Sequence, residues 1–246
     1  MDKNKQVFVV VAHPDDEIIG CGSTMAKHAA QGDRVHVLFV ADGVTSRTYQ
    51  PGMSLPRTKE LKQNAKALKQ RKHEAKAALQ VIGVNPKDIY FLDLKDQRLD
   101  TYPILDIIKR IEAVKAKVNP DTVYTHFYGD LNLDHVLVSR AVMTAFRPRP
   151  SGEQTDVLMM EIPETTHLGA AVGQKFIPNH VENISSYMGR KIQALDMYGS
   201  EARAYPDKRS TRYLKEWAKI RGERKKYPFA EAFVKVSYRI SGREYI

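Results

Sequence analysis

The segment on which the fold prediction depends most reads VFVVVAHPDDE and covers residues 7–17. Its first six residues are apolar and rich in valine, whose branched side chain packs well on a pleated surface, so they predict a fully buried central strand. A histidine, a proline and three acids follow at once. In open α/β sheets, ligands bind just beyond the carboxyl ends of the strands. The segment therefore predicts a functional site directly after the first strand.

Apolar runs and helical periodicities alternate through the first half of the chain. The predicted strands cover residues 7–12, 35–41, 89–92 and 123–126, and the predicted helices cover residues 18–30, 58–82, 102–118 and 134–146. Strands that alternate with helices of this length predict βαβ units and a mostly parallel, doubly wound sheet flanked by helices. Residues 43–56 are polar and rich in turn formers, so we expect a long loop after the second strand, a position that often carries function.

The second half of the chain is less regular. It contains apolar or periodic segments at residues 157–162, 185–198, 210–224 and 233–240, which predict a strand, two helices and a half-exposed strand. Pro148, Pro150 and Gly152 mark a subdomain edge. We expect a single domain over residues 1–246, with an α/β core at 1–147 and a C-terminal subdomain at 148–246 that completes the substrate site.

Composition limits the class of protein. The chain has 246 residues, 42% of them hydrophobic, which is enough for a sizeable core. The net charge of +10 favours anionic partners but does not choose among them. We expect a mainly solvated basic surface without nucleic-acid binding, because no recognised reading motif is present; membrane contact stays open. Cys21 is the only cysteine, which excludes an intrachain disulfide. Without an apolar run of signal or membrane-spanning length, a cytoplasmic protein is expected.

A metal centre is predicted from His13, Asp16 and His135. His13 and Asp16 flank a proline-containing turn at a strand end, and His135 follows another strand and opens a helix, the same topological position. Three ligands of histidine and carboxylate type leave a fourth tetrahedral position for water, the pattern of a catalytic zinc site. Asp15, beside the ligands, is a candidate general base for that water.

These residues resemble the PIG-L/LmbE-like zinc-dependent N-deacetylases. The closest match is Ala12-His13-Pro14-Asp15-Asp16-Glu17, and the resemblance extends over nearly the whole chain. Further matching segments are Asp42-Gly43-Val44 with Ser46-Arg47, Arg71 and Glu74, residues 130–135, Ile177-Pro178-Asn179, residues 191–201, Arg209-Ser210, Arg221-Gly222 and residues 230–233. The resemblance implies a Rossmann-like fold, zinc on His13, Asp16 and His135, Asp15 as general base, and hydrolysis of an N-acyl group, usually acetyl on an N-acetylglucosamine-type sugar.

The chain departs from the family pattern at two places. Many members carry a histidine where this chain has Asn132, and that histidine is implied to stabilise the oxyanion. An asparagine amide donates a hydrogen bond but supplies neither a proton nor a positive charge. We therefore name Asn132 as a catalytic candidate with an open role. Asp207-Lys208 stands where His-Pro is expected, so a histidine that faces the substrate is missing.

Substrate contacts are expected from Arg47 in the long loop and, by the resemblance, from Asn179 and Arg209. For Arg47 a solvated arginine is the alternative. Asp134 either orients one of the metal ligands from behind or is the N-cap of its helix. His126 either faces the site behind the ligands or is a hydrogen-bonded core histidine.

Several of these sequence features also have purely structural explanations. The acids after Pro14 are also typical of a helix start. Arg71 and Glu74 are spaced as a structural ion pair on one helix. Gly20-Cys21-Gly22 lacks the third glycine of a dinucleotide fingerprint, so NAD binding is not expected.

The predicted function is a zinc-dependent hydrolase that removes an N-acetyl group from an amino sugar, with or without phosphate, or from a nucleotide- or lipid-linked glycan precursor. Another divalent metal would also fit the ligands. The alternatives are a hydrolase of another amide, such as a thiol-conjugate or an antibiotic side chain, and a non-catalytic sugar- or nucleotide-binding protein that retains the metal. The sequence leaves the exact substrate and the oligomeric state open, and a homo-oligomer is allowed.

Overall fold

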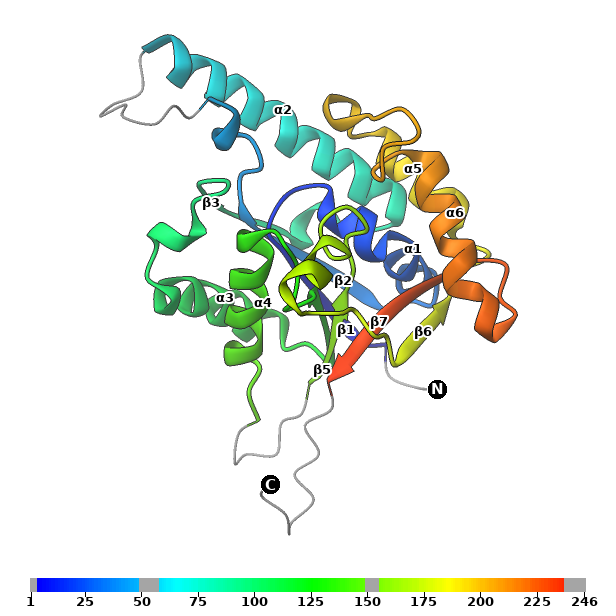
Figure 1. The fold of residues 1–246 in the computed structure, drawn as a ribbon. Coiled ribbons are helices and arrows are strands. Elements are labelled where there is room, and N and C mark those ends of the chain that lie inside the picture. The colour runs from blue at the N-terminus through cyan, green and yellow to red at the C-terminus, as the bar shows by residue number, and fades with distance from the viewer. Residues whose placement is uncertain (1–3, 49–57, 149–154, 237–246) are drawn as a thin grey trace.

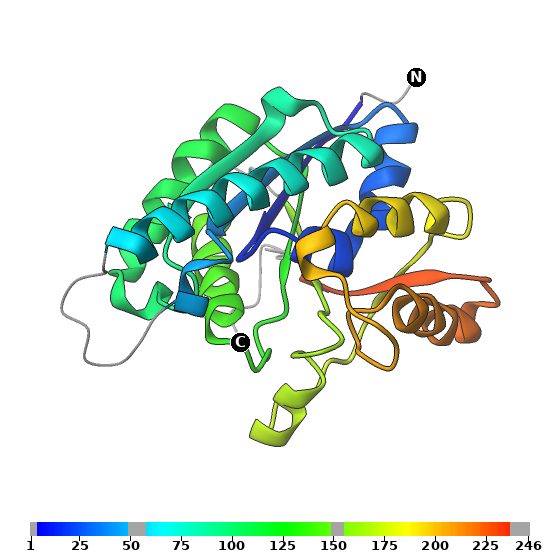
Figure 2. The same ribbon diagram turned by 90° about the horizontal axis from the view of Figure 1, so that it is seen from above.

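The structure is a computed structural model that describes residues 4–48, 58–148 and 155–236. A seven-stranded sheet forms the middle layer, with helices on both faces (Figures 1 and 2). The sheet is mostly parallel, as the alternating sequence pattern predicts. The Rossmann-like α/β class is therefore confirmed.

The strand order is β3-β2-β1-β4-β5-β7-β6. The five strands on the β3 side run parallel, and β7 is antiparallel to both of its neighbours. The strands are β1 (Gln6–Val11), β2 (Arg34–Ala41), β3 (Ile89–Leu94), β4 (Thr122–His126), β5 (Asp156–Met160), β6 (His180–Asn183) and β7 (Ala230–Val236). Because β4 pairs with β5, the segments before and after the predicted subdomain edge share one sheet.

Six α-helices are described and cover the two faces of the sheet. They are α1 (Asp16–Ala30), α2 (Thr58–Ile82), α3 (Ile104–Val118), α4 (Leu133–Ala145), α5 (Met188–Asp196) and α6 (Thr211–Gly222). Helices α3 and α4 pack on one face, and α1, α2 and α5 pack on the other (Figure 2). None of these helices is both long and apolar enough to cross a membrane.

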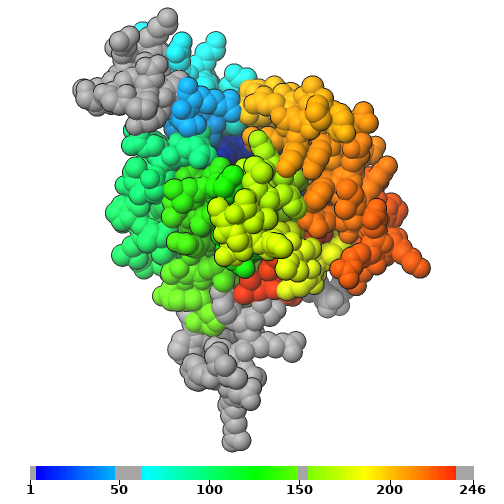
Figure 3. Space-filling view, viewed as in Figure 1, coloured from blue at the N-terminus to red at the C-terminus, as the bar shows by residue number. Residues whose placement is uncertain are grey.

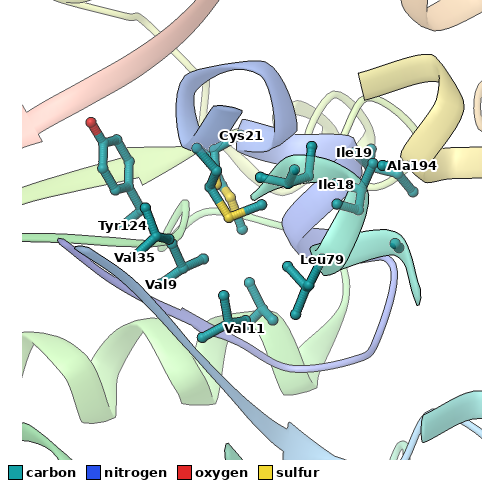
Figure 4. Packing of buried hydrophobic residues seen from close by; sticks show 14 of the residues in the cluster. Val9, Val11, Ile18, Ile19, Cys21, Val35, Leu79, Tyr124 and Ala194 are labelled. Carbon is teal, nitrogen blue, oxygen red and sulfur yellow. The ribbon is translucent and has the colours of Figure 1, made fainter. Parts of the chain in front are cut away.

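Strand β1 contributes to both hydrophobic layers because its side chains alternate between the faces. Val7, Val9 and Val11 pack with α1 and α2, whereas Phe8 and Val10 pack with α3 and α4. All five are completely buried. Figure 4 shows the first layer, in which side chains of α1 and α2 meet Val9 and Val11. A strand buried on both faces reads as a continuous apolar run, which explains why no polar residue interrupts it.

The position of β1 in the sheet also places the predicted site. From β1 the chain continues outward through β2 to β3, and β4 then returns to the other side of β1. The strand order therefore reverses between β1 and β4. In doubly wound sheets the crevice outside the carboxyl ends of the strands at such a switch point is the usual ligand site. The segments that follow these two strands are the ones that carry His13 and His135.

The second half differs from its sequence-based prediction in detail. Strand β6 was not predicted, since its four residues HVEN carry little β signal. Strand β7 begins three residues before the predicted start at Phe233, and the predicted end lies outside the described residues. Of the predicted loop, residues 43–48 are described and include a short 3-10 helix, Thr45–Thr48; the remainder lies outside the described residues.

Candidate active site and metal centre

A cavity of about 250 Å³ opens at the switch point between β1 and β4. In Figure 3 the dark blue of the amino-terminal segment is visible at the bottom of a hollow bounded by green and orange segments. Both halves of the chain line this cavity, whose residues include His13, Asp15, Asp16, Arg47, Arg71, Asp96, Asn132, His135, Glu164, Thr165, Glu201 and Arg209.

The turn between β1 and α1 presents its side chains to the cavity through an unusual backbone. Asp15 has a φ of 119°, a conformation that costs a non-glycine residue energy and that is found mainly where the surroundings impose it. The Asp16 carboxylate accepts a hydrogen bond from the His13 main-chain N–H at 2.9 Å, and Glu17 accepts one from the Asp15 N–H at 2.9 Å. These bonds hold the turn that points Asp15 and Asp16 into the cavity.

The three predicted ligands lie together. Asp16 Oδ2 is 3.3 Å from His13 Nδ1 and 3.3 Å from His135 Nε2. Metal–ligand distances of 2.0–2.2 Å in a tetrahedral zinc site correspond to ligand–ligand separations of about 3.3 Å. The three donor atoms lie within 4.8 Å of one another, and all three residues are buried. Both distances from Asp16 therefore match the spacing of a zinc site, and the three residues are candidates to hold a divalent metal.

Each histidine of this group has a carboxylate on its other ring nitrogen. His13 Nε2 lies 3.1 Å from Asp134 Oδ2 and 3.0 Å from Asp96 Oδ1, while His135 Nδ1 lies 3.2 Å from Asp130 Oδ1. Such carboxylate partners fix the tautomer and the ring orientation of histidines that bind metal. The geometry leaves Nδ1 of His13 and Nε2 of His135 free to act as ligands.

The carboxylates around His13 and His135 favour a positive charge among these three residues. Burial lowers the pKa of His135, but the Asp16 and Asp130 carboxylates raise it more, to about 9. Burial likewise lowers the pKa of His13, whereas its hydrogen bonds with Asp134, Asp16 and Asp96 raise it well above the ordinary value. Either protonated imidazoles or a bound cation can balance the negative charge of the carboxylates. A divalent cation does so while the imidazole rings stay neutral.

Asp15 lies beside this group but takes no part in it. Its Oδ2 forms an ion pair with the Arg209 guanidinium, and its Oδ1 is buried without a hydrogen-bond partner among the described residues. Burial raises the pKa of Asp15 to about 6, although Arg209 opposes the shift. A carboxylate with this pKa is ionised at neutral pH and still accepts a proton readily.

Asn132 caps helix α4, a role that the sequence analysis had considered for Asp134. The Asn132 side-chain oxygen accepts a hydrogen bond from the Asp134 main-chain N–H at 3.0 Å. Asp134 instead accepts from the N–H groups of Gln97 and Leu99 and contacts His13. Because the oxygen of Asn132 is used as the cap, its amide NH₂ is the group that remains to donate into the cavity.

His126 packs against His135, one of the three candidate metal ligands. Its ring stacks on that of His135, with centroids 4.0 Å apart and planes 6° from parallel. The Nε2 atom accepts a hydrogen bond from the Ala12 N–H at 2.8 Å, and burial lowers the pKa of His126 to about 3. The ring is therefore neutral and packs against a ligand histidine, which combines both alternatives considered for it.

Arginines and acids form the outer wall of the cavity. Glu201 Oε1 forms ion pairs with both Arg47 and Arg71. Burial raises the pKa of Glu201, but the two arginines lower it by more than burial raises it. The pKa of Glu201 therefore lies below its usual range. The expected pair of Arg71 with Glu74 is present at 3.6 Å, and Arg71 also donates to the Pro14 carbonyl. Arg47 is therefore paired rather than simply solvated.

Asn179, which is expected to contact substrate, lies away from the cavity in this structure, and the expectation stays a prediction. Asn179 is exposed and does not line the cavity. Its side-chain amide is engaged twice with the main chain of Lys235, because Asn179 Nδ2 donates to the Lys235 carbonyl and Asn179 Oδ1 accepts from the Lys235 N–H. These bonds tie the segment before β6 to β7, so its role there is structural.

Three acidic residues that line the cavity, Asp96, Glu164 and Glu201, are not among the site candidates predicted from the sequence. Asp96 follows β3 as His13 follows β1, so its place at the same edge of the sheet was a usable signal. Glu164 lies in an irregular segment that no periodicity or motif marks, and Glu201 ends the segment 191–201 that resembles the family, in a short 3-10 helix, Gly199–Glu201. Only the tertiary packing brings them to the cavity.

Fold and site together define a Rossmann-like α/β protein with a histidine and carboxylate centre suited to a divalent metal. Residues 8–146 match the model of the family described as "PIG-L: GlcNAc-PI de-N-acetylase". The chain belongs to the PIG-L family, as the resemblance of its motifs indicated.

Known proteins agree with this membership. A probable N-acetyl-alpha-D-glucosaminyl L-malate deacetylase 2 from Bacillus cereus is 29% identical over 202 residues, which cover 81% of this chain and 85% of that protein. A 4-oxalmesaconate hydratase from Pseudomonas putida is 30% identical over 145 residues, 57% of this chain and 51% of that protein. The solved N,N'-diacetylchitobiose deacetylase from Pyrococcus horikoshii has the same fold, with a TM-score of 0.72 and 20% identity over 96% of this chain and 86% of its own.

Proposed function

We propose that this protein is a zinc-dependent hydrolase that removes the N-acetyl group from an amino sugar or from a nucleotide- or lipid-linked glycan precursor. The observation that carries the proposal is the convergence of His13 Nδ1 and His135 Nε2 on Asp16 Oδ2, each at 3.3 Å, at a cavity that Asp15 also lines. The names of deacetylases among the similar proteins support the acetamido substrate.

Zinc would be held by His13, Asp16 and His135, and once bound it would polarise the acyl carbonyl and lower the pKa of a water molecule. The carboxylates of Asp134 and Asp130 keep the two imidazoles oriented for this role. Burial of all three ligands keeps bulk water away from the donor atoms, which strengthens the electrostatic interactions within the site.

Asp15 is the proposed general base. It takes a proton from the water that attacks the acyl carbon, and it returns this proton to the amine nitrogen as the C–N bond breaks. Its raised pKa suits both steps, since the carboxylate is ionised before the attack and its acid form is strong enough to give the proton back. Arg209 pairs with Asp15 Oδ2, whereas Oδ1 has no hydrogen-bond partner among the described residues and is the oxygen proposed to take the proton.

The Asn132 amide is proposed to donate a hydrogen bond to the oxyanion of the tetrahedral intermediate. Hydrogen-bond donors placed at a developing negative charge are among the largest contributions to acyl-transfer catalysis. Arg47 and Arg209, at the outer wall, are proposed to bind hydroxyl or phosphate groups of the substrate. The Asn132 amide supplies no proton, so Asp15 would serve as both base and acid.

Hydration of an unsaturated carboxylate is the second candidate function. It is favoured by the similarity to a hydratase and by the three cavity arginines, Arg47, Arg71 and Arg209, which match carboxylate groups in charge. A water-activating metal centre beside a carboxylate base serves hydration as well as hydrolysis.

One assay separates the candidates. The purified protein is incubated with a panel of N-acetylated sugars and their nucleotide conjugates, of other amides, and of unsaturated dicarboxylates, each with zinc and with a chelator. We expect release of a primary amine from an acetamido sugar that stops with the chelator and returns with zinc. Amine release only from another amide, or loss of the double bond without amine release, assigns the function elsewhere. Zinc binding without any turnover identifies a binding protein.

A further inference from the structure

Helix α1, which begins at the metal ligand Asp16, is broken after little more than one turn. Cys21 has a φ of −142° and a ψ of 23°, which are not helical values. Glycines stand on either side of it, and a side chain at Gly20 would clash with Met160 of β5. The lack of a side chain at Gly20 thus lets this part of the helix lie close to β5, and the break leaves a short first segment, residues 16–20, and a longer second segment. Figure 4 shows Cys21 at this point of α1, above the core.

A break in a helix leaves main-chain groups without their usual partners. Two buried side chains from the second half of the chain replace them. Lys191 Nζ donates to the Ile19 carbonyl at 2.7 Å, at the end of the first segment. The Glu231 carboxylate accepts from the main-chain N–H groups of Ser23 at 3.1 Å and Thr24 at 2.8 Å, at the start of the second segment.

The two capping side chains are also bound to each other. Lys191 Nζ lies 2.7 Å from Glu231 Oε1, and each side chain is only 5% exposed. A buried ion pair is often no more stabilising than apolar side chains of the same volume. This pair lies inside the break, where each charged side chain caps the end of one helix segment. Its role is therefore better explained by the geometry of the helix than by stability.

The short first segment is the part of α1 that matters for the proposed chemistry. A single helical turn is not stable by itself, so its direction depends on what holds its ends. Its start carries Asp16 and follows Asp15, and Ile19 lies one turn further along the same face. Lys191 therefore holds the turn at the end opposite the cavity.

We propose that Lys191 and Glu231 are positioning residues for the metal centre: as a buried ion pair that caps both sides of the break in α1, they set the orientation of the turn that carries Asp15 and Asp16. This inference rests on the metal ligands named in the proposed function and is independent of the substrate. Lys191 comes from α5 and Glu231 from β7, so the second half of the chain would control the zinc affinity of ligands in the first half.

The test compares zinc affinity with stability. The dissociation constant for zinc is measured by competition with a chromogenic chelator for the wild type and for Lys191→Met, Glu231→Gln and the double variant Lys191→Met/Glu231→Leu, with thermal unfolding followed by circular dichroism. Loss of a positioning group around a metal typically weakens binding about 10–100-fold. The double variant leaves no unpaired buried charge, so we expect it to regain stability relative to Lys191→Met while its zinc affinity stays at least about 10-fold weaker than that of the wild type.

Asp88→Asn is the matched control. It also removes a buried carboxylate from an ion pair, with Arg34, but at the amino ends of the strands, away from the cavity. We expect lower stability and unchanged zinc affinity. Zinc affinity that recovers with stability in the double variant, or that is unchanged in Glu231→Gln, would overturn the inference. If the wild type itself binds no zinc, the proposed function fails before this inference is reached. If the double variant does not fold, Glu231→Gln decides alone, because it keeps the size of the side chain.

Discussion

The inner and outer sides of the cavity are built in different ways. The inner side follows β1 and β4, and its histidines and carboxylates lie in the turns after these strands and at the starts of α1 and α4, where each ring nitrogen of His13 and His135 is within 3.3 Å of a carboxylate. The outer side comes from irregular segments that carry Glu164, Glu201 and Arg209, held by ion pairs between long side chains. The inner side is therefore fixed by short local contacts among the candidate metal ligands, whereas the outer side depends on long side chains from distant segments. That division suits a family whose similar members act on different compounds.

The largest expected effect of a single change lies at the boundary between the two sides. Asp15→Asn keeps the size of the side chain and removes the proposed base, so kcat should fall by about a hundredfold to ten-thousandfold. Zinc affinity should stay within a few-fold, because Asp15 is not a ligand. Steady-state kinetics and chelator competition on the same preparation measure both quantities. A variant with nearly normal turnover would show that the base is another group.

A smaller effect, on the inner side, tests its preorganisation. Asp130→Asn removes the negative charge that faces Nδ1 of His135, so zinc affinity should fall by about 10–100-fold. Asp156→Asn makes the same chemical change at a carboxylate that pairs with Lys235 away from the cavity, and it should leave zinc affinity unchanged. Equal zinc affinities of the two variants would contradict the view that the outer partners of the ligands are part of the site.

The inner side is also the part of the cavity that can be predicted from the sequence. Buried strands have a local signature, and the carboxyl ends of parallel strands meet at one edge, so the convergence of His13 and His135 could be anticipated from two short motifs. Asp96 belongs to the same edge and could have been found by the same argument. In contrast, the ion pairs of Glu201 with Arg47 and Arg71 join segments more than a hundred residues apart, and no local pattern encodes them. Strand β6 was missed for a related reason. Its residues have little intrinsic strand propensity, and its conformation depends on pairing with β7.

Arg209 offers a test of how the outer side acts on the inner side. Its guanidinium lowers the pKa of Asp15, which burial raises. In Arg209→Gln this lowering is lost, so the pKa of Asp15 should rise. Since the base works only when it is ionised, the acidic limb of the pH profile of kcat/KM should move to higher pH, with the largest loss of activity below neutrality.

Arg203→Gln is the matched control for this change. Arg203 contacts the same wall through Glu201, at 3.5 Å, but it is not among the groups that shift the pKa of Asp15 most. Its variant should keep the acidic limb of the wild type. An acidic limb that is unchanged in Arg209→Gln would mean that Arg209 affects only substrate binding, which would appear as a raised KM at every pH.

The smallest expected effect concerns Asn179, which by the family resemblance contacts substrate but which does not line the cavity in the structure. Its side chain makes two hydrogen bonds with the Lys235 main chain, so Asn179→Ala should cost about 1–2 kcal/mol of stability, less where solvent replaces the exposed partners. Because Asn179 does not line the cavity, kcat and KM should stay within about twofold of the wild type at a temperature where the variant is folded. Urea unfolding and steady-state kinetics measure the two effects separately. A KM raised well beyond twofold with normal stability would return Asn179 to the substrate site, and it would mean that the segment before β6 approaches the cavity when substrate binds.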